Sequence, residues 1–114
     1  MVNPARERGL ENFSVPSDIR SLLFGSEISS HYVQPHIGGD QALLQGIAKA
    51  LLLMAKKNPK VIATTFIQSS TEHFEVFKED LLQIPWAQLE SESGVSRQEM
   101  ESLAVRYAKA ENVV

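Results

Sequence analysis

The stretch IGGDQALLQGIAKALLLMAKK, residues 37–57, decides the fold of this chain. Two glycines come first, an aspartate follows, and the rest is apolar at helical spacing. Glycines at the start of a helix let a ligand approach the main chain, where the first N–H groups have no partner within the helix. A carboxylate there can cap the helix or accept hydrogen bonds from a donor-rich ligand. The stretch therefore predicts a buried helix with a candidate binding site at its start.

The helix itself is predicted from Gln41 to Lys57, because Asn58 and Pro59 end it. Its apolar side chains form two neighbouring stripes, namely Leu43, Ile47, Leu51 and Met54 and, beside them, Leu44, Ala48 and Leu52. A helix that is apolar over so much of its circumference is normally buried on several sides. Gly46 in its interior costs about 1 kcal/mol relative to alanine. Close packing of another element against Gly46 is the expected compensation.

Residues 1–39 are predicted to be rich in loops, with the stub of a strand at Val2 and one short helix over residues 16–24, which Gly25 stops. Residues 40–114 are predicted to be helical. The β-branched run over residues 61–67 could form a strand, but a short helix is preferred because no partner strand is visible. The whole chain is thus expected to be mainly α-helical.

Two capping boxes place the starts of later helices. Ser69 with Glu72 predicts one start and Ser96 with Glu99 another, each by the Ser-x-x-Glu spacing. The residues expected on the apolar faces of the helices that follow them are Phe74, Phe77 and Leu81 in the first, and Met100, Leu103, Ala104 and Tyr107 in the last. Between them, Pro85 suits the first turn of a short helix that carries Trp86 and Leu89 and that Gly94 ends. Val95 and Met100 stand at the two positions of a hydrophobic staple around the last helix start.

Composition excludes several classes of function. The chain has 114 residues, 43% of them apolar, and a formal net charge of −3, which argues against a general nucleic-acid binder. No apolar run reaches the roughly 20 residues that span a bilayer. The absence of cysteine excludes a disulfide framework, an iron–sulfur cluster and a cysteine-rich zinc site within these residues. The first residues also lack the layout of a secretory signal peptide.

Other polar residues give only weak signals of chemistry. His31, His36 and His73 have no carboxylate at a metal-ligand spacing, so no metal site is expected. Ser69 and Ser70 have the pattern of helix caps and not of nucleophiles. The Gly-Val-Ser turn at residues 94–96 is also typical of helix-turn-helix DNA binders, but the helix after it is nearly neutral. DNA binding therefore stays a minor alternative.

The residues alone leave two interpretations of Asp40 open. An ordinary N-cap contributes about 1 kcal/mol and needs no ligand. The glycines at positions 38 and 39, and the donor-rich and acceptor-rich loop over residues 29–36, instead suit the polar head group of a ligand.

The order and spacing of several short patterns resemble a known family over essentially the whole chain. These patterns are Val2-Asn3-Pro4-x-Arg6-Glu7-x-Gly9-Leu10, Gln34-Pro35-x-Ile37-Gly38-Gly39-Asp40-x-Ala42-Leu43, Gly46-Ile47-Ala48-Lys49, Phe66-Ile67-x-x-x-Thr71-x-x-Phe74-Glu75 and Ser93-Gly94-Val95-Ser96 with Leu103, Ala104, Tyr107 and Ala108. Together they resemble the molybdopterin oxidoreductases, and most closely the formate dehydrogenase-like alpha subunits. Members of that family are several times longer than this chain. The resemblance therefore implies one internal fragment, residues 1–114, a helical segment excised from a Rossmann-like α/β dinucleotide-binding domain.

The resemblance also implies a cofactor and a set of site residues. Such enzymes hold molybdenum or tungsten between two molybdopterin guanine dinucleotides, and the region matched here meets the guanosine end of one of them. By analogy, Asn3 faces the ribose or guanine, Arg6 lies near the phosphates or sugar, and Gly38, Gly39 and Asp40 take the place of a Gly-Thr-Asp motif whose aspartate reads guanine. Gly39 replaces the usual threonine, and Asn3 stands where many relatives carry aspartate. No catalytic or metal-ligating residue is implied within the chain.

These implications give the expected function. The parent enzyme would be a cytoplasmic oxidoreductase acting on a small substrate, and the fragment alone would be inactive and hold no cofactor. Its expected partners are the rest of the parent polypeptide and, through exposed apolar surface, further copies of itself. Neither nucleic acid nor membrane is expected as a partner. The main alternative is a stand-alone helical module for protein interaction.

Overall fold

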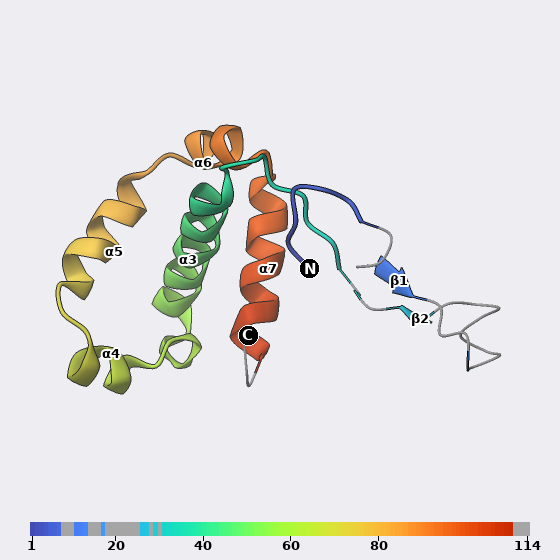
Figure 1. Cartoon of the computed structure of the whole chain (residues 1–114). Coiled ribbons are helices and arrows are strands. Elements are labelled where there is room, and N and C mark those ends of the chain that lie inside the picture. Colours follow the sequence, from blue (N-terminus) through green and yellow to red (C-terminus); the bar gives the residue numbers. More distant parts are fainter. Residues whose placement is uncertain (8–10, 14–16, 18–25, 28, 30, 111–114) are drawn as a thin grey trace.

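The computed structural model describes residues 1–7, 11–13, 17, 26–27, 29 and 31–110. Within these residues the chain is mainly α-helical, as the sequence predicts (Figure 1). The elements are β1 (Asn12–Phe13), β2 (Ser26–Glu27), α3 (Asp40–Lys57), the 3-10 turn η1 (Pro59–Val61), α4 (Thr64–Ser70), α5 (Phe74–Gln83), α6 (Trp86–Ser93) and α7 (Arg97–Lys109). The short helix expected over residues 16–24 falls almost wholly outside the described residues.

Strands β1 and β2 pair antiparallel, with Asn12 opposite Glu27 and Phe13 opposite Ser26. The sequence predicts only loop at both places. Strands of two residues are too short for the alternating pattern by which a strand is recognised, so the sequence carried no signal for them.

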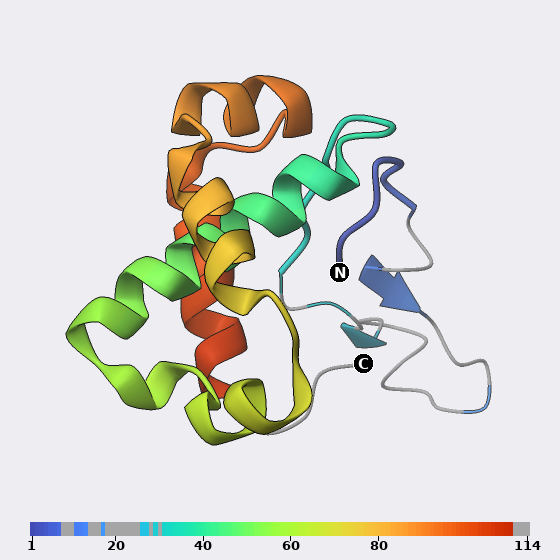
Figure 2. The ribbon, with the colours of Figure 1, turned by 90° about the vertical axis from the view of Figure 1, so that its left-hand side faces the viewer.

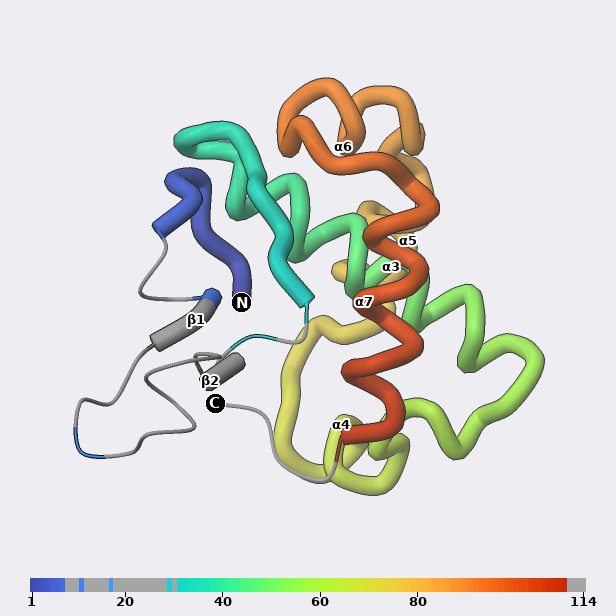
Figure 3. Tube along the Cα trace, turned by 90° about the vertical axis from the view of Figure 1, so that its right-hand side faces the viewer, coloured from blue at the N-terminus to red at the C-terminus, as the bar shows by residue number. Residues whose placement is uncertain are grey.

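The N-terminal segment lies parallel to the segment that leads into α3. Val2 forms an isolated parallel bridge with Val33, which confirms that the chain is extended at Val2. The Asn3 N–H donates to the Val33 carbonyl at 3.0 Å, and the Val33 N–H donates to the Met1 carbonyl at 2.9 Å. The Tyr32 hydroxyl adds a bond to the Ala5 carbonyl at 2.7 Å. Residues 1–5 and 31–35 therefore run side by side into neighbouring turns (Figure 3).

Helix α3 is the central element, and it packs against α6 and α7 (Figure 2). It ends at Lys57, with Asn58 as its C-cap, as predicted. Its buried residues are Ala42, Leu43, Gly46, Lys49, Ala50 and Leu52. The expectation of burial on several sides is wrong for its first turns, because Leu44 is 65% exposed. Helices α6 and α7 cover the side of α3 that carries Leu43 and Gly46, and Leu44 lies outside that contact.

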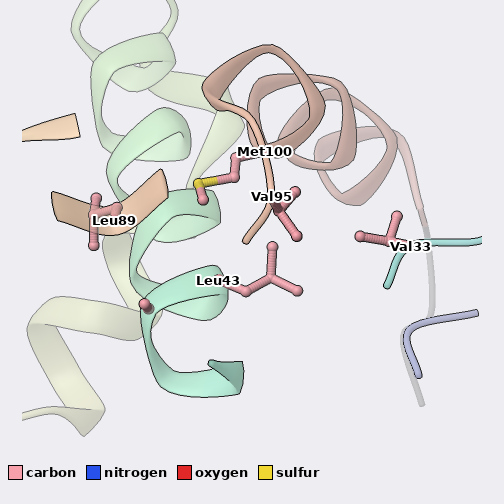
Figure 4. Packing of buried hydrophobic residues seen from close by; sticks show 6 residues of the cluster. Val33, Leu43, Leu89, Val95 and Met100 are labelled. Carbon is pink, nitrogen blue, oxygen red and sulfur yellow. The ribbon is translucent and has the colours of Figure 1, made fainter. Parts of the chain in front are cut away.

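The core is a cluster of Val33, Ala42, Leu43, Leu89, Val95 and Met100, drawn from the N-terminal region, α3, α6, the α6–α7 turn and α7 (Figure 4). Gly46 faces this cluster, and a Cβ atom built on it would overlap Sδ of Met100. The close packing that the sequence predicts for Gly46 is thus confirmed. Both members of the expected hydrophobic staple, Val95 and Met100, are buried in the same cluster.

The region after α3 confirms one prediction and corrects another. Residues 61–67 enter η1 and α4 and form no strand. The predicted capping box of Ser69 and Glu72 is wrong, because Ser69 lies inside α4 and its hydroxyl donates to the Phe66 carbonyl at 3.3 Å. The next helix, α5, begins later, after His73, which has a positive φ of 58°. The chain uses this left-handed residue, and no serine cap, to turn from α4 into α5.

Helices α6 and α7 form where the sequence places them. Pro85 precedes α6, and Gly94 ends it with a φ of 71°, which glycine adopts without strain. Ser96 caps α7 by accepting from the Glu99 N–H at 3.2 Å. The second half of the predicted box is wrong, because the Glu99 carboxylate lies 2.5 Å from Nε2 of His31. Glu99 thus ties the N-terminal region to α7.

The chain is more extended than its length requires. Its radius of gyration is 17.3 Å, whereas a compact domain of about 100 residues has about 13 Å. Large apolar side chains accordingly lie open on several elements, among them Leu44, Phe66, Val76 and Phe77. Across the part of the chain that the structure describes, no helix is both long and apolar enough to cross a bilayer.

Candidate functional site

A tight turn over residues 36–39 precedes α3. The Gly39 N–H donates to the His36 carbonyl at 2.8 Å, which closes the turn. Gly38 occupies its third position with a φ of 82°, where glycine is favoured. A Cβ atom on Gly38 would meet nothing within 4 Å, and Ile37 beside it is 93% exposed. The tip of the turn is therefore open to whatever approaches the start of α3.

The base of this turn rests on the end of α6. Gly39 is buried, and a Cβ atom there would lie 2.7 Å from the Glu92 carbonyl oxygen and 2.9 Å from the Ser93 Cα. The His36 N–H donates to the Ser93 carbonyl at 2.7 Å. The His36 ring lies where a Cβ atom on Gly94 would be, and Gly94 has a positive φ of 71°, where glycine is favoured. The contact between this turn and α6 was not predicted from the sequence, although the adjacent glycines at positions 38 and 39 were a signal of close packing.

Asp40 is the first residue of α3, and Gly39 occupies the N-cap position. The interpretation of Asp40 as an ordinary N-cap is therefore wrong, since α3 has no side-chain cap hydrogen bond. The turn closed by Gly39 places the cap one residue earlier than the sequence suggests. The Asp40 side chain is exposed in the first helical turn, where the helix dipole favours a negative charge.

Asn3 and Arg6 lie on the N-terminal segment and have partners there. The Asn3 side-chain oxygen accepts from the Ala5 N–H at 3.0 Å, and its Nδ2 donates to Oε1 of Glu7 at 3.3 Å. Arg6 pairs with Glu11 at 2.7 Å between Nε and Oε1, although 67% of its side chain is exposed. The bond from the Ala5 N–H to Asn3 fixes a local turn after Asn3. The ion pair with Glu11 holds Arg6 within its own segment.

The parallel bridge brings these two groups of residues to one edge. Because the bridge between Val2 and Val33 is parallel, Asn3 and Gln34, the residues that follow, continue from the same end of it. Gln34 also donates from Nε2 to the Pro4 carbonyl at 3.4 Å. The turn that carries Gly38, Gly39 and Asp40 follows directly after Gln34. Ligands of open parallel sheets bind beyond the carboxyl ends of the strands, and the two segments here are joined by a single parallel bridge.

A buried cation that the sequence analysis did not single out lies deeper in α3. Lys49 is only 6% exposed, and its Nζ donates to the Leu82 carbonyl at 3.0 Å and to the Ile84 carbonyl. Nζ also lies 5.4 Å from the centre of the Trp86 ring, with Cζ of Arg97 at 5.0 Å from the same ring. Burial, and then the charge of Arg97, lower the pKa of Lys49 below its ordinary value. A lysine within the apolar run over residues 47–55 was the available signal.

Lys49 makes stability depend on pH. Because its pKa is lowered in the folded chain, the folded state disfavours the charged form, and this penalty is relieved as pH rises from the folded pKa towards the ordinary 10.5. We therefore expect the free energy of unfolding of the wild type to rise relative to that of Lys49→Met over this interval, by about 1.4 kcal/mol for each unit of pKa shift. Urea unfolding from pH 7 upwards measures the difference. A difference that stays flat with pH would contradict the burial of the charge.

The histidines do not gather into a metal site. Among the described residues, no cluster of three or more histidine, aspartate or glutamate side chains could hold a metal ion. His31 is engaged by Glu99 and His36 packs on Gly94, while His73 provides the turn before α5.

Comparison with known proteins places these residues in a wider context. No family model matches the chain, and no solved structure matches it significantly. The chain is 36% identical over 120 aligned positions to "Protein YdeP" of Escherichia coli K12, an alignment that covers 99% of the chain and 16% of that protein. It is 25% identical over 115 positions to "Uncharacterized oxidoreductase Rv2900c" of Mycobacterium tuberculosis, covering 99% of the chain and 15% of that protein. "Uncharacterized oxidoreductase Mb2924c" of Mycobacterium bovis matches to the same extent. Nearly the whole chain is thus similar to a region that makes up about one sixth of the length of each of these relatives. Two of the three are named as oxidoreductases.

Proposed function

We propose that this chain is a segment of a formate dehydrogenase-like molybdopterin oxidoreductase and contributes to the binding of the guanosine end of a molybdopterin guanine dinucleotide. The observation that carries the proposal is the parallel bridge between Val2 and Val33, which directs Asn3 and the glycine turn to one edge. This is the arrangement expected of two strand ends in a dinucleotide-binding sheet. The names of the mycobacterial relatives support the broader class, oxidoreductase.

The chemistry of the helix start fits guanine. Guanine presents two neighbouring donors, the ring N1–H and the exocyclic amino group, and one carboxylate can accept from both. The Asp40 carboxylate is exposed and makes no cap bond, so its two oxygens are available to such a pair. Gly38 leaves open space beside it, into which a flat base can approach the main chain. A bidentate, charge-assisted contact of this type is both strong and selective.

The other proposed residues would meet the sugar and phosphates. The Arg6 guanidinium is largely exposed and could exchange its partner Glu11 for a phosphate, to which arginine binds in a bidentate manner. Asn3 would contribute through its side-chain amide or by fixing the turn that presents Arg6. Gly39 would act by seating the turn on α6. When bound, the metal of the cofactor supplies the two-electron chemistry, and these residues only hold and orient its nucleotide end.

The proposal predicts that Asp40→Ala lowers cofactor occupancy in the polypeptide that contains this segment. Losing a charge-assisted bidentate contact should weaken binding by about 10–100-fold. The molybdenum or tungsten content per polypeptide, measured by mass spectrometry of the purified protein, reports the effect. Asp40→Asn is the matched variant, because an amide keeps the size but presents only one acceptor oxygen.

Two outcomes would contradict the proposal at different levels. Leu44→Gln, an exposed apolar control, should behave like the wild type. If Asp40→Ala also kept the metal content of the wild type, Asp40 would not belong to the binding site. If extraction and chromatography found no guanine nucleotide of any kind in a protein that contains this segment, the proposed cofactor would be excluded. The mutant and the extraction therefore test the residue and the ligand separately.

A further inference from the structure

Ser93, the last residue of α6, is a polar residue held entirely inside the fold. It is fully buried, although serine is mostly an exposed residue in proteins. Its hydroxyl donates to the Leu89 carbonyl at 2.6 Å and accepts from the Val95 N–H at 3.1 Å. These two bonds lie on either side of Gly94, where the chain turns with a φ of 71° from α6 towards α7. The Ser93 hydroxyl therefore fixes the shape of the corner between α6 and α7.

The backbone of the same residue supports the glycine turn. The Ser93 carbonyl accepts from the His36 N–H at 2.7 Å, and the Ser93 Cα lies 2.9 Å from where a Cβ atom on Gly39 would be. One residue thus carries both the hydroxyl that shapes the corner and backbone atoms on which the turn over residues 36–39 rests. Asp40 follows that turn directly, as the first residue of α3. A shift of the corner therefore shifts the turn and, with it, the start of α3.

We infer that Ser93 is a positioning residue for the proposed nucleotide site. Its hydroxyl sets the corner, the corner sets the glycine turn, and the turn sets where the Asp40 carboxylate stands. The inference rests on the proposed function, since the position of Asp40 matters only if Asp40 binds the guanosine end of the cofactor. Ser93 is fully buried, so it acts on a ligand only through the residues that it places.

The physical reason is the hydrogen bond that the corner would lose. In the described part of the chain, the Ser93 hydroxyl is the acceptor of the Val95 N–H, and this bond is buried. A buried donor without a partner is costly, so without the hydroxyl the corner must move until the Val95 N–H meets water or another acceptor. That movement pulls on the bond between the Ser93 carbonyl and the His36 N–H.

Hydrogen exchange of the cofactor-free polypeptide that contains this segment tests the first step. We expect Ser93→Ala to raise the exchange rates of the His36 and Gly39 N–H groups by at least about tenfold, because the corner that holds them opens more often. Mass spectrometry of peptides that cover residues 33–41 reads these rates. Ser93→Cys keeps nearly the same volume but is a weaker hydrogen-bonding group, so its rates should lie between those of the wild type and Ser93→Ala.

Ser96→Ala is the matched control, because it removes a serine hydroxyl from the other end of the same corner. The Ser96 hydroxyl accepts from the Glu99 N–H at 3.2 Å and caps α7. Its loss should raise exchange in the first turn of α7 and leave residues 36–39 unchanged. Circular dichroism of each variant reports whether the helices are retained.

Cofactor content tests the second step. Ser93→Ala should lower the molybdenum or tungsten content per polypeptide through binding that is about tenfold weaker, at the lower end of what groups that orient a binding residue contribute. In the Asp40→Ala background the same substitution should have almost no further effect, because the residue that Ser93 positions is already gone. A merely structural role for Ser93 would lower the content by the same factor in both backgrounds.

Three results would overturn the inference. They are unchanged exchange of residues 36–39 in Ser93→Ala, equally raised exchange there in Ser96→Ala, and a loss of metal content that persists in the Asp40→Ala background. Failure of the proposed function would appear separately, as unchanged metal content in Asp40→Ala alone. The exchange rates are measured without cofactor and do not depend on that result.

Discussion

Replacing Gly39 by alanine is expected to lower the free energy of unfolding by about 3 kcal/mol, because added volume in a packed region forces the surroundings to move. The new Cβ atom would lie 2.7 Å from the Glu92 carbonyl oxygen and 2.9 Å from the Ser93 Cα. Both are backbone atoms at the end of α6, so no side chain can rotate away to make room. The turn before α3 must then separate from α6, with loss of the bond from the His36 N–H to the Ser93 carbonyl. Equilibrium unfolding in urea, followed by the fluorescence of Trp86, measures the loss.

Gly38→Ala is the matched control for this prediction. It adds the same methyl group one residue earlier, where nothing lies within 4 Å, so only the positive φ of 82° opposes it. The expected cost is about 1 kcal/mol, from the strain of an alanine in the left-handed region. If Gly38→Ala proved as destabilising as Gly39→Ala, the contact between the turn and α6 would not be the reason that Gly39 is required.

Replacing Met100 by alanine is expected to cost about 2–5 kcal/mol, the usual range for removing a large buried side chain. Met100 is fully buried in the core cluster, and its sulfur occupies the space beside Gly46. Its removal leaves a cavity where α3 and α7 meet, the most extensive contact between two helices of the described chain. Thermal unfolding monitored by circular dichroism at 222 nm gives the change in stability.

Adding Gly46→Ala tests whether these two residues share one volume. In the wild type, Gly46→Ala should destabilise, because overlap with Met100 outweighs the gain of about 1 kcal/mol in helix propensity. In Met100→Ala the same substitution fills part of the cavity and should stabilise. A double-mutant cycle in which the two effects simply add would show that Gly46 is not shaped by Met100.

Local patterns in the sequence predicted the helices well. The end of α3 before Pro59, the end of α6 at Gly94 and the cap at Ser96 each follow from a single residue whose backbone or side chain acts on its own neighbours. The staple of Val95 and Met100 was also predictable, because both of its members lie within one helical start. Such signals are local, and the physics that makes them is complete within a few residues.

Several of the errors arose where distant parts of the chain decide the outcome. Glu99 pairs with His31 and so does not complete its capping box, and Lys49 is buried because the carbonyls at the end of α5 accept its hydrogen bonds. Leu44 is exposed because no described helix covers its side of α3. The residues of the candidate site were predicted as a set through resemblance, and their roles remain predictions. Their placement on one edge depends on the bridge between Val2 and Val33, for which the sequence offered only the hint of a strand at Val2.

The seat of the glycine turn on α6 also bears on the order in which the chain folds. His36 and Gly39 are held by Glu92 and Ser93, which follow far later in the chain. Joining residues so distant closes a long loop, and its entropic cost must be met before the contact can stabilise anything. Helix α3 can form as soon as its own residues are available. The turn over residues 36–39 that precedes it acquires its final shape only after α6 has packed against it. During synthesis the start of α3 is therefore completed only after the later residues of α6 have been made and have packed against it.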